Sequence, residues 1–257
     1  MGFTLLALGI AIVLFFGMFG LEVYGFRYGR ARALRHPESA RHGLGSVEGA
    51  VYGLLGLLVA FSFSGAASRF EHRRDQIITE ANAVGTAYLR LDVLPQELQP
   101  SLREKFRSYL DARLAVYSKL PDVDAAQAEL ARAGALQGEI WKEAVAASRA
   151  EGTPASRLLL PALNEMFDIA TARTAAAYAH PPPMLFVVLV ALALISAYLV
   201  GDGMSESETA SRLHMVTYAA VMAIVVYVVI DLEFPRFGLI RLTGADRFLV
   251  EVRQAMQ

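Results

Sequence analysis

Four long apolar runs dominate the sequence and limit the folds that it can adopt. Each holds roughly 16 to 21 residues, close to the ~20 that an α-helix needs to cross the ~30 Å hydrocarbon core of a bilayer. Their one charged residue is Glu48. The first run lacks a basic n-region, so we expect a membrane span there rather than a secretory signal. The four predicted spans are Phe3–Leu21, Val47–Ala67, Met184–Val200 and Met215–Ile230.

The runs divide the chain into two membrane hairpins and a polar region between them. We expect residues 1–67 to form the first hairpin, 68–183 a helical soluble region, 184–232 the second hairpin and 233–257 a C-terminal tail. The sequence contains no alternating apolar and polar run long enough for a strand. The predicted fold class is therefore all-α, an integral membrane protein with four transmembrane helices and a helical soluble extension.

Helical periodicity continues through the soluble region. Apolar residues recur at spacings of three, four and seven within Phe70–Tyr88, and the Leu94-Pro95 step separates this helix from a second one predicted at Gln99–Ser118. Pro181, Pro182 and Pro183 predict a rigid, extended joint before the third membrane span. Further helical segments are predicted at Asp122–Ala133, Leu136–Ala150 and Leu158–Ala179, with Pro154 as a helix start.

Composition and motifs exclude several classes of function. The chain has no cysteine, which excludes disulfides, thiol catalysis and Cys-based metal sites, and its five histidines lack metal-ligand spacing. A formal net charge of −1 does not favour nucleic acid as a partner. The sequence contains no GxSxG, P-loop, dinucleotide-binding or HExxH motif. We therefore expect neither enzymatic activity nor a bound cofactor or metal.

Two stretches rich in small residues predict close helix packing. Gly49 and Gly53 form a GxxxG spacing that Gly56 extends, which allows a neighbouring helix to approach. The segment EANAVGTAYLR interleaves small residues with polar ones that need partners in such a contact. We interpret both as packing or assembly motifs, and the second supplies Glu80, Asn82, Gly85 and Thr86.

The second half of the same membrane span contains the candidate pore residues. Phe61, Ser64 and Ser68 share one helical face, whereas Ser62 and Phe63 point elsewhere. Serine hydroxyls in a membrane helix commonly bond back to the backbone, and that is one interpretation. If several copies surround an axis, the alternative is a pore with hydroxyl groups and an aromatic constriction.

Charged residues follow this span directly. Arg69 and Arg73 form a like-charge pair four residues apart, as do Glu71 and Asp75, so the spacing does not favour pairing within the helix. Partners on other helices or subunits are therefore expected. In an oligomer, Arg69, Glu71 and Arg73 are the predicted charges at a pore exit.

Three further carboxylates lie at predicted membrane boundaries. Glu22 ends the first span, and Asp231 and Glu233 follow the fourth. An ionisable group inside a bilayer is a functional candidate, whereas an interfacial one is commonly only solvated. Both interpretations stay open for these three residues.

Three stretches and the triple proline before the third span are distinctive. The stretches are GLLGLLVAFSFSGAASRFEHRRDQIITEANAVGTAYLRLDVLP, ALNEMFDIATARTAA and VIDLEFPRFGLIRL. They closely resemble the bacterial bestrophin-like domain family, four-helix membrane proteins of largely unassigned function. The resemblance covers nearly the whole chain from about Val47, and the bestrophin anion channels are more distantly similar.

This resemblance implies a multi-pass protein of the bacterial inner membrane that assembles into a homo-oligomer, a pentamer in the anion channels. It implies that Phe61 to Ser64 lie near the pore and that small inorganic ions and the lipid bilayer are the partners. No acidic cluster has calcium-loop spacing, so calcium gating is not implied. Basic residues near both membrane faces nearly balance, and the acidic stretch before Arg212 favours a cytoplasmic soluble region.

Two functions of different classes follow. The first is an oligomeric channel for small monovalent anions, with the second span lining the pore. The alternative is a non-conducting membrane scaffold or sensor whose soluble helices bind a partner. Oligomeric state separates them, because four helices in one copy leave no obvious aqueous path.

Overall fold

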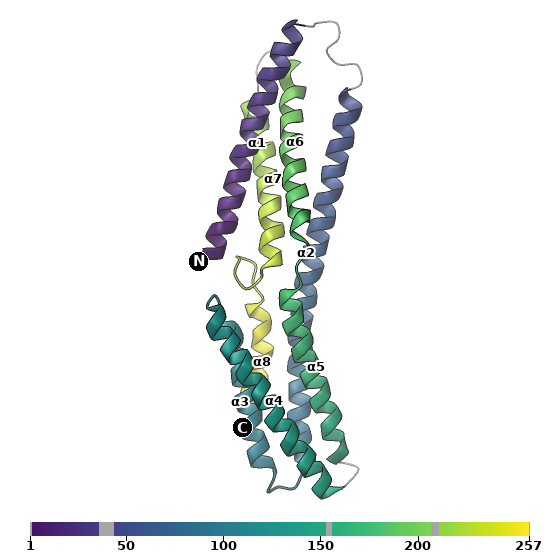
Figure 1. Cartoon of the computed structure of the whole chain (residues 1–257), viewed down its shortest axis with the longest axis vertical. Coiled ribbons are helices and arrows are strands. Elements are labelled where there is room, and N and C mark those ends of the chain that lie inside the picture. Colours follow the sequence, from purple (N-terminus) through teal and green to yellow (C-terminus); the bar gives the residue numbers. More distant parts are fainter. Residues whose placement is uncertain (1, 36–43, 153–155, 207–210, 257) are drawn as a thin grey trace. The chain divides into compact units, whose positions relative to one another are not determined.

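The computed structural model describes residues 2–35, 44–152, 156–206 and 211–256 (Figure 1). Within these ranges the chain is helical and contains no strand, which confirms the predicted all-α class. Three short 3-10 helices occur at Arg90–Val93, Ser156–Leu158 and Met204–Glu206. The α-helices are α1 (Gly2–Arg35), α2 (Leu44–Leu89), α3 (Gln99–Ser118), α4 (Val123–Glu151), α5 (Leu159–Tyr178), α6 (Pro183–Gly203), α7 (Arg212–Glu233) and α8 (Thr243–Ala255).

The helices form two compact units. Unit 1 comprises Met1–Arg69 and His180–Phe234, and unit 2 comprises Phe70–Ala179 and Pro235–Gln257. Four helices, α1, α2, α6 and α7, are long and apolar enough to cross a membrane, as predicted. All four contribute to unit 1, and α2 continues without a break beyond Arg69 into unit 2.

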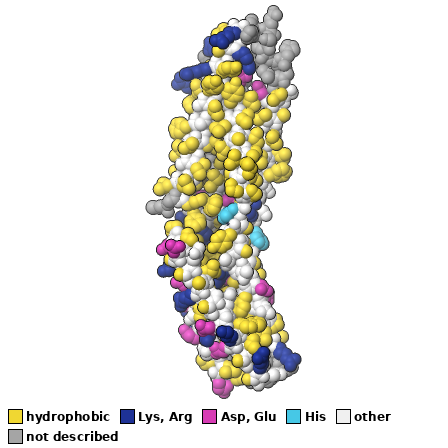
Figure 2. Space-filling model, in the orientation of Figure 1, with side chains coloured by type: hydrophobic (Ala, Val, Ile, Leu, Met, Phe, Trp, Pro, Cys, Tyr) yellow, Lys and Arg dark blue, Asp and Glu magenta, His cyan; other side chains and the backbone are white. Residues whose placement is uncertain are grey.

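Unit 1 has a narrow core and an apolar surface. The buried cluster that α1, α2, α6 and α7 share contains small residues such as Ala193 and Ala219 as well as larger ones such as Met18. Large hydrophobic side chains, including Val13 and Ile224, are exposed instead. Figure 2 shows that hydrophobic side chains occupy much of the visible face of this unit. Exposed apolar side chains are unfavourable in water but suit a helix in contact with lipid.

In unit 1, α1 and α6 pack closely against each other at two glycines. A Cβ atom added at Gly201 would collide with the backbone carbonyl of Glu22, and one added at Gly25 would collide with that of Tyr198. Glycine is therefore required at both positions, because any other residue would force the two helices apart. The GxxxG spacing predicted close packing in the second span, and no sequence pattern pointed to this contact between the first and third spans.

Unit 2 packs the second part of α2 with α3, α4, α5 and α8 around a larger core. Ile77, Val84 and Tyr88 on α2 are buried there, which confirms the predicted apolar face, and Trp141 on α4 packs against the same cluster. The predicted helix Gln99–Ser118 coincides with α3. Leu94 is extended, with φ −88° and ψ 159°, and it separates the two helices as the following proline predicted.

Two features of unit 2 were not predicted from the sequence. Asp122–Ala133 and Leu136–Ala150 form one continuous helix, α4, because the glycine between them continues the helical backbone. The predicted tail from residue 233 contains α8, whose Leu249 is completely buried. Pro154 lies outside the described residues. Pro182 is extended and Pro183 is the first residue of α6, in agreement with the predicted joint.

Candidate functional site

The candidate pore residues on α2 do not all share one environment. Phe61 and Phe63 are 67% and 46% exposed, and Ser64 and Ser68 are exposed as well. Ser62 is buried in unit 1, and its hydroxyl oxygen has no hydrogen-bond partner among the described residues. The exposed face is available to lipid or to another copy of the chain, whereas Ser62 faces the subunit interior. Pore lining stays a prediction.

The glycines of the second span are also exposed. A Cβ atom added at Gly49, Gly53 or Gly56 would meet no described atom within 4 Å. Within the described part of one subunit this small-residue stripe therefore has no close partner. If this stripe packs closely as predicted, the partner helix would belong to another subunit.

Arg69 has a partner on another helix, as the charge spacing predicted. Its Nε donates to Glu233 Oε1 at 2.8 Å, and its Nη2 contacts the same oxygen. Glu233 is fully buried at the end of α7, and His180 Nδ1 lies 3.6 Å from its other oxygen. The His180 ring stacks on Phe234 with centroids 4.5 Å apart. Arg69 therefore ties α2 to the end of α7 within unit 1.

Arg73 caps the end of α5 within unit 2. Its Nε and Nη2 donate to the carbonyl oxygens of Ala176 and Ala179, at 3.0 and 2.8 Å. Ala176 lies in the last turn of α5 and Ala179 directly follows the helix, where the helix dipole favours a cation. Glu71, by contrast, is exposed and pairs with Arg74 at 2.8 Å. The three predicted exit charges therefore occupy three different environments.

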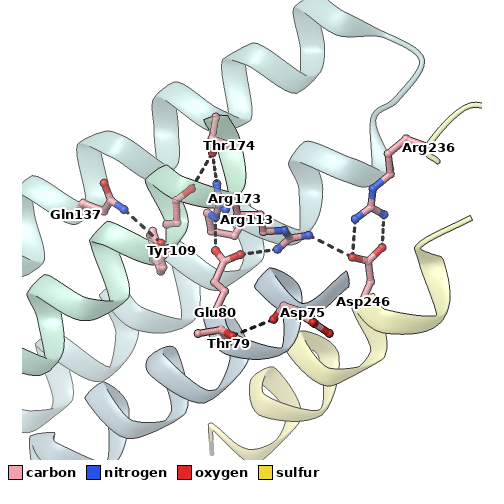
Figure 3. Close-up of polar contacts among 11 residues, drawn as sticks. Asp75, Thr79, Glu80, Tyr109, Arg113, Gln137, Arg173, Thr174, Arg236 and Asp246 are labelled. Carbon is pink, nitrogen blue, oxygen red and sulfur yellow. Dashed lines mark hydrogen bonds and ion pairs between the residues drawn. The ribbon is translucent and has the colours of Figure 1, made fainter. Parts of the chain in front are cut away.

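Unit 2 contains a charge network centred on Glu80, which is completely buried. Arg113 Nε on α3 donates to one carboxylate oxygen at 2.6 Å, and Arg173 Nη1 on α5 donates to the other (Figure 3). Burial alone would raise the pKa of Glu80, but the two guanidinium groups outweigh it and hold this pKa below its usual value. Burial would lower the pKa of Arg113, whereas Glu80 raises it above the usual arginine value. Glu80 is therefore an ionised link between α2, α3 and α5.

The network continues to α8. Arg173 Nη2 donates to Asp246 at 3.2 Å, and Arg236 donates to both oxygens of the same carboxylate, one of them at 2.9 Å (Figure 3). The guanidinium carbons of Arg173 and Arg236 lie 4.1 and 4.4 Å from the Tyr117 ring centroid, in cation–π range. Glu80 was selected from the sequence, but its partners were not. An arginine on the apolar face of α3, Arg113, indicated that a buried positive charge needs an acidic partner.

The other residues of the EANAVGTAYLR stretch are placed differently from Glu80. Asn82 and Thr86 are exposed on α2. A Cβ atom at Gly85 would make an ordinary contact of 3.9 Å with Val252 on α8. Glu80 therefore serves packing within the subunit, and an assembly role for Asn82 and Thr86 stays a prediction.

The boundary carboxylates are all buried in unit 1. Asp231 accepts a hydrogen bond from Tyr227 at 3.3 Å, whereas neither oxygen of Glu22 has a hydrogen-bond partner among the described residues. Across the described ranges, no group of three or more histidine and acidic side chains is arranged to hold a metal ion.

Comparisons with known proteins identify the family. The sequence matches the family model of the Bestrophin-like domain over residues 16–243, most of the 257-residue chain. The chain therefore belongs to the bestrophin-like family, which confirms the resemblance seen in the sequence. A search of curated proteins found no match.

Solved structures share the fold. One variant of a bacterial bestrophin homologue from Klebsiella pneumoniae is 14% identical, with 96% of each chain covered and a TM-score of 0.72. Another variant is 15% identical, with 94% of this chain and 97% of that chain covered and a TM-score of 0.68. At these identities the likeness concerns the fold alone.

Proposed function

We propose that the chain forms a homo-oligomeric ion channel in which α2 of each copy lines the pore. The observation that carries this proposal is the exposed face of α2, where Phe61, Ser64 and Ser68 lie within a span long enough to cross a bilayer. Around an axis, such faces would combine hydroxyl groups with an aromatic constriction. Membership of the bestrophin-like family supports a channel and disfavours an enzyme.

The conducted ions are proposed to be small monovalent anions, and the oligomer a pentamer in a bacterial inner membrane with unit 2 on the cytoplasmic side. Support comes from the similarity to bestrophin anion channels stated above. Arg69 contributes a cation next to the span, although its charge is balanced by Glu233. Replacing it therefore tests whether local charge sets selectivity.

Chloride efflux from liposomes containing the purified protein tests conduction. We expect efflux above that of empty vesicles and a change of about tenfold or more on Phe61→Ala. Phe16→Ala is the matched control, because Phe16 on α1 is 64% exposed and lies outside the proposed pore. Arg69→Glu should lower the preference for chloride over sodium.

Two results would reject the channel. One is equal leak from empty vesicles, the wild type and both phenylalanine variants. The other is a monomer or dimer by native mass spectrometry in mild detergent, because one copy has too few helices to enclose a path. Either result would favour a scaffold or sensor that does not conduct.

A further inference from the structure

The last turns of α1 in unit 1 carry positive charge that the proposed channel does not use. Arg27 and Arg35 are exposed there, and they form no ion pair within the described ranges. Arg32, in contrast, donates to Asp202 on α6 at 2.7 Å. Figure 2 shows Lys and Arg side chains gathered at the end of unit 1 where α1 terminates. Two cations are therefore available at this end to an anion from outside the subunit.

A single face of α1 changes from apolar to aromatic to basic along its length. Phe16 is 64% exposed on this face, and Tyr24 and Tyr28 are 58% and 50% exposed. Helical spacing places Arg27 and Arg35 on the same face, the first between the two tyrosines and the second at the end of the helix. This order is typical of a helix that leaves a bilayer through the headgroup region.

The depth of Arg27 follows from two helices. On α1 the apolar run ends at Leu21, and Arg27 lies about 9 Å further along the axis at 1.5 Å per residue. On α6 the apolar run ends at Val200, and Gly25 of α1 lies directly against the Tyr198 carbonyl. A headgroup region is about 5–8 Å thick, and Cα–Cβ bonds in a helix tilt toward its N-terminus, which here is the bilayer side. Arg27 therefore lies within reach of the headgroups.

The tyrosines beside Arg27 belong to a small aromatic cluster. The ring centroid of Tyr24 lies 6.2 Å from that of Tyr28 and 6.1 Å from that of Tyr198 on α6. Tyrosine suits a membrane interface because its ring contacts acyl chains while its hydroxyl reaches polar groups. The cluster therefore offers apolar contact and hydroxyl groups on either side of the Arg27 position.

We propose that Tyr24, Arg27 and Tyr28 bind the headgroup of an anionic phospholipid. The planar guanidinium group donates two parallel hydrogen bonds to phosphate oxygens. A zwitterionic lipid has the same phosphate, but its own cation offsets the charge, so Arg27 favours the anionic lipid. Arg35 lies about 12 Å beyond Arg27 and adds a weaker attraction, because salt screens charges over about 8 Å. The proposal does not depend on conduction by α2.

Native mass spectrometry of the full-length protein in detergent tests this site. Phosphatidylglycerol and chain-deuterated phosphatidylcholine with the same acyl chains are supplied in equal amounts, and the ratio of bound lipids is measured. We expect the wild type to retain mainly phosphatidylglycerol. Arg27→Gln should lower the ratio by about fivefold and Arg35→Gln by about twofold or less. Arg27→Lys, which keeps the charge, should restore most of the preference.

Arg132→Gln is the matched control, because Arg132 is an exposed arginine on α4 of unit 2, outside the membrane spans. It should leave the lipid ratio unchanged. Equal ratios in the wild type and Arg27→Gln, or the same loss in Arg132→Gln, would overturn the proposal. A lower oligomer mass for Arg27→Gln would also overturn it, because this face would then be a subunit contact. Free glycerol phosphate lacks acyl chains and should not displace the lipid at millimolar concentration, and displacement would indicate a site for a soluble phosphate instead.

Discussion

Units 1 and 2 hold their helices together in different ways. In unit 1, α1 and α6 approach so closely that only glycine fits at Gly25 and Gly201, and the buried carboxyl of Glu22 has no hydrogen-bond partner within the described ranges. In unit 2, the buried Glu80 is bonded to arginines from two other helices. Unit 1 therefore combines close contact at glycine with single ion pairs such as Arg69–Glu233, whereas unit 2 places a charge network from several helices within a larger apolar core.

A buried ion network and an apolar core also respond differently when one residue is replaced. A buried ion network can be no more stabilising than a well-packed apolar core of the same volume, because desolvation of the charges opposes their attraction. Removal of one partner is still costly, since it leaves a charge buried without compensation. Unit 2 should therefore respond much more strongly to loss of one charge than to loss of an exposed ion pair.

The largest expected effect comes from Glu80→Ala. It leaves Arg113 and Arg173 without their shared carboxylate, and we expect unit 2 to lose about 3–5 kcal/mol of unfolding free energy. Hydrogen–deuterium exchange of the α3 and α5 amides measures this loss. Glu71→Ala is the control on the same helix, because its pair with Arg74 is exposed, and its effect should stay within about 0.5 kcal/mol. Similar exchange in both variants would contradict a stabilising role of the network.

A smaller effect is expected from Gly201→Leu in unit 1. The new side chain would collide with the Glu22 backbone, and overpacking of this kind costs about 1–3 kcal/mol. Unfolding in sodium dodecyl sulfate, followed by circular dichroism, gives the change for the subunit. Gly53→Leu is the control, since a Cβ atom added there would meet no described atom within 4 Å. If Gly53→Leu alone lowered the oligomer mass, that would support assembly through the exposed glycines.

Arg73→Ala tests whether this arginine stabilises the end of α5 or contributes a charge to the proposed pore. Loss of its two hydrogen bonds to α5 carbonyls should destabilise the end of that helix by about 1–2 kcal/mol. Faster exchange of the amides at residues 174–179 would report it. Arg74→Ala, whose side chain is half exposed, should leave those amides unchanged. A change in chloride flux without faster exchange would instead favour a pore role.

The smallest effect is the acid response of Glu80. Because the folded-state pKa of Glu80 lies below its unfolded value, its ionised form stabilises unit 2 above about pH 4.5, and this contribution is lost as the pH falls through the folded pKa. The difference in urea stability between wild type and Glu80→Gln should therefore stay constant from about pH 7 to pH 5 and shrink below pH 4.5. A difference independent of pH down to acid unfolding would show that folding does not lower the pKa of Glu80.

Much of the fold could be predicted because its signals are local. Runs of apolar residues define the four spans, and apolar periodicity with one proline step defines α2 and α3. The predicted break in α4 was wrong, because Gly134 lowers helix propensity by only about 1 kcal/mol and the flanking alanines are strong helix formers. The helix α8 could have been predicted as well, because the apolar residues Ala245, Leu249 and Val252 lie at helical spacing.

The site was predicted only in part because its contacts are not local. Glu80 stood out as a carboxylate among small residues, but its partners lie 33 and 93 positions away, and a single sequence contains no information on such pairing. The same limit applies to Arg69, whose spacing predicted a partner on another helix without naming Glu233.

The position of Trp141 makes the two units separable by spectroscopy. It is the chain's only tryptophan, and it packs against the core of unit 2. Excitation at the red edge of the aromatic absorption band therefore yields fluorescence from unit 2 alone, whereas far-ultraviolet circular dichroism reports helix content throughout the chain. Unfolding followed with both signals on one sample would show whether the two units lose their structure together, without a label.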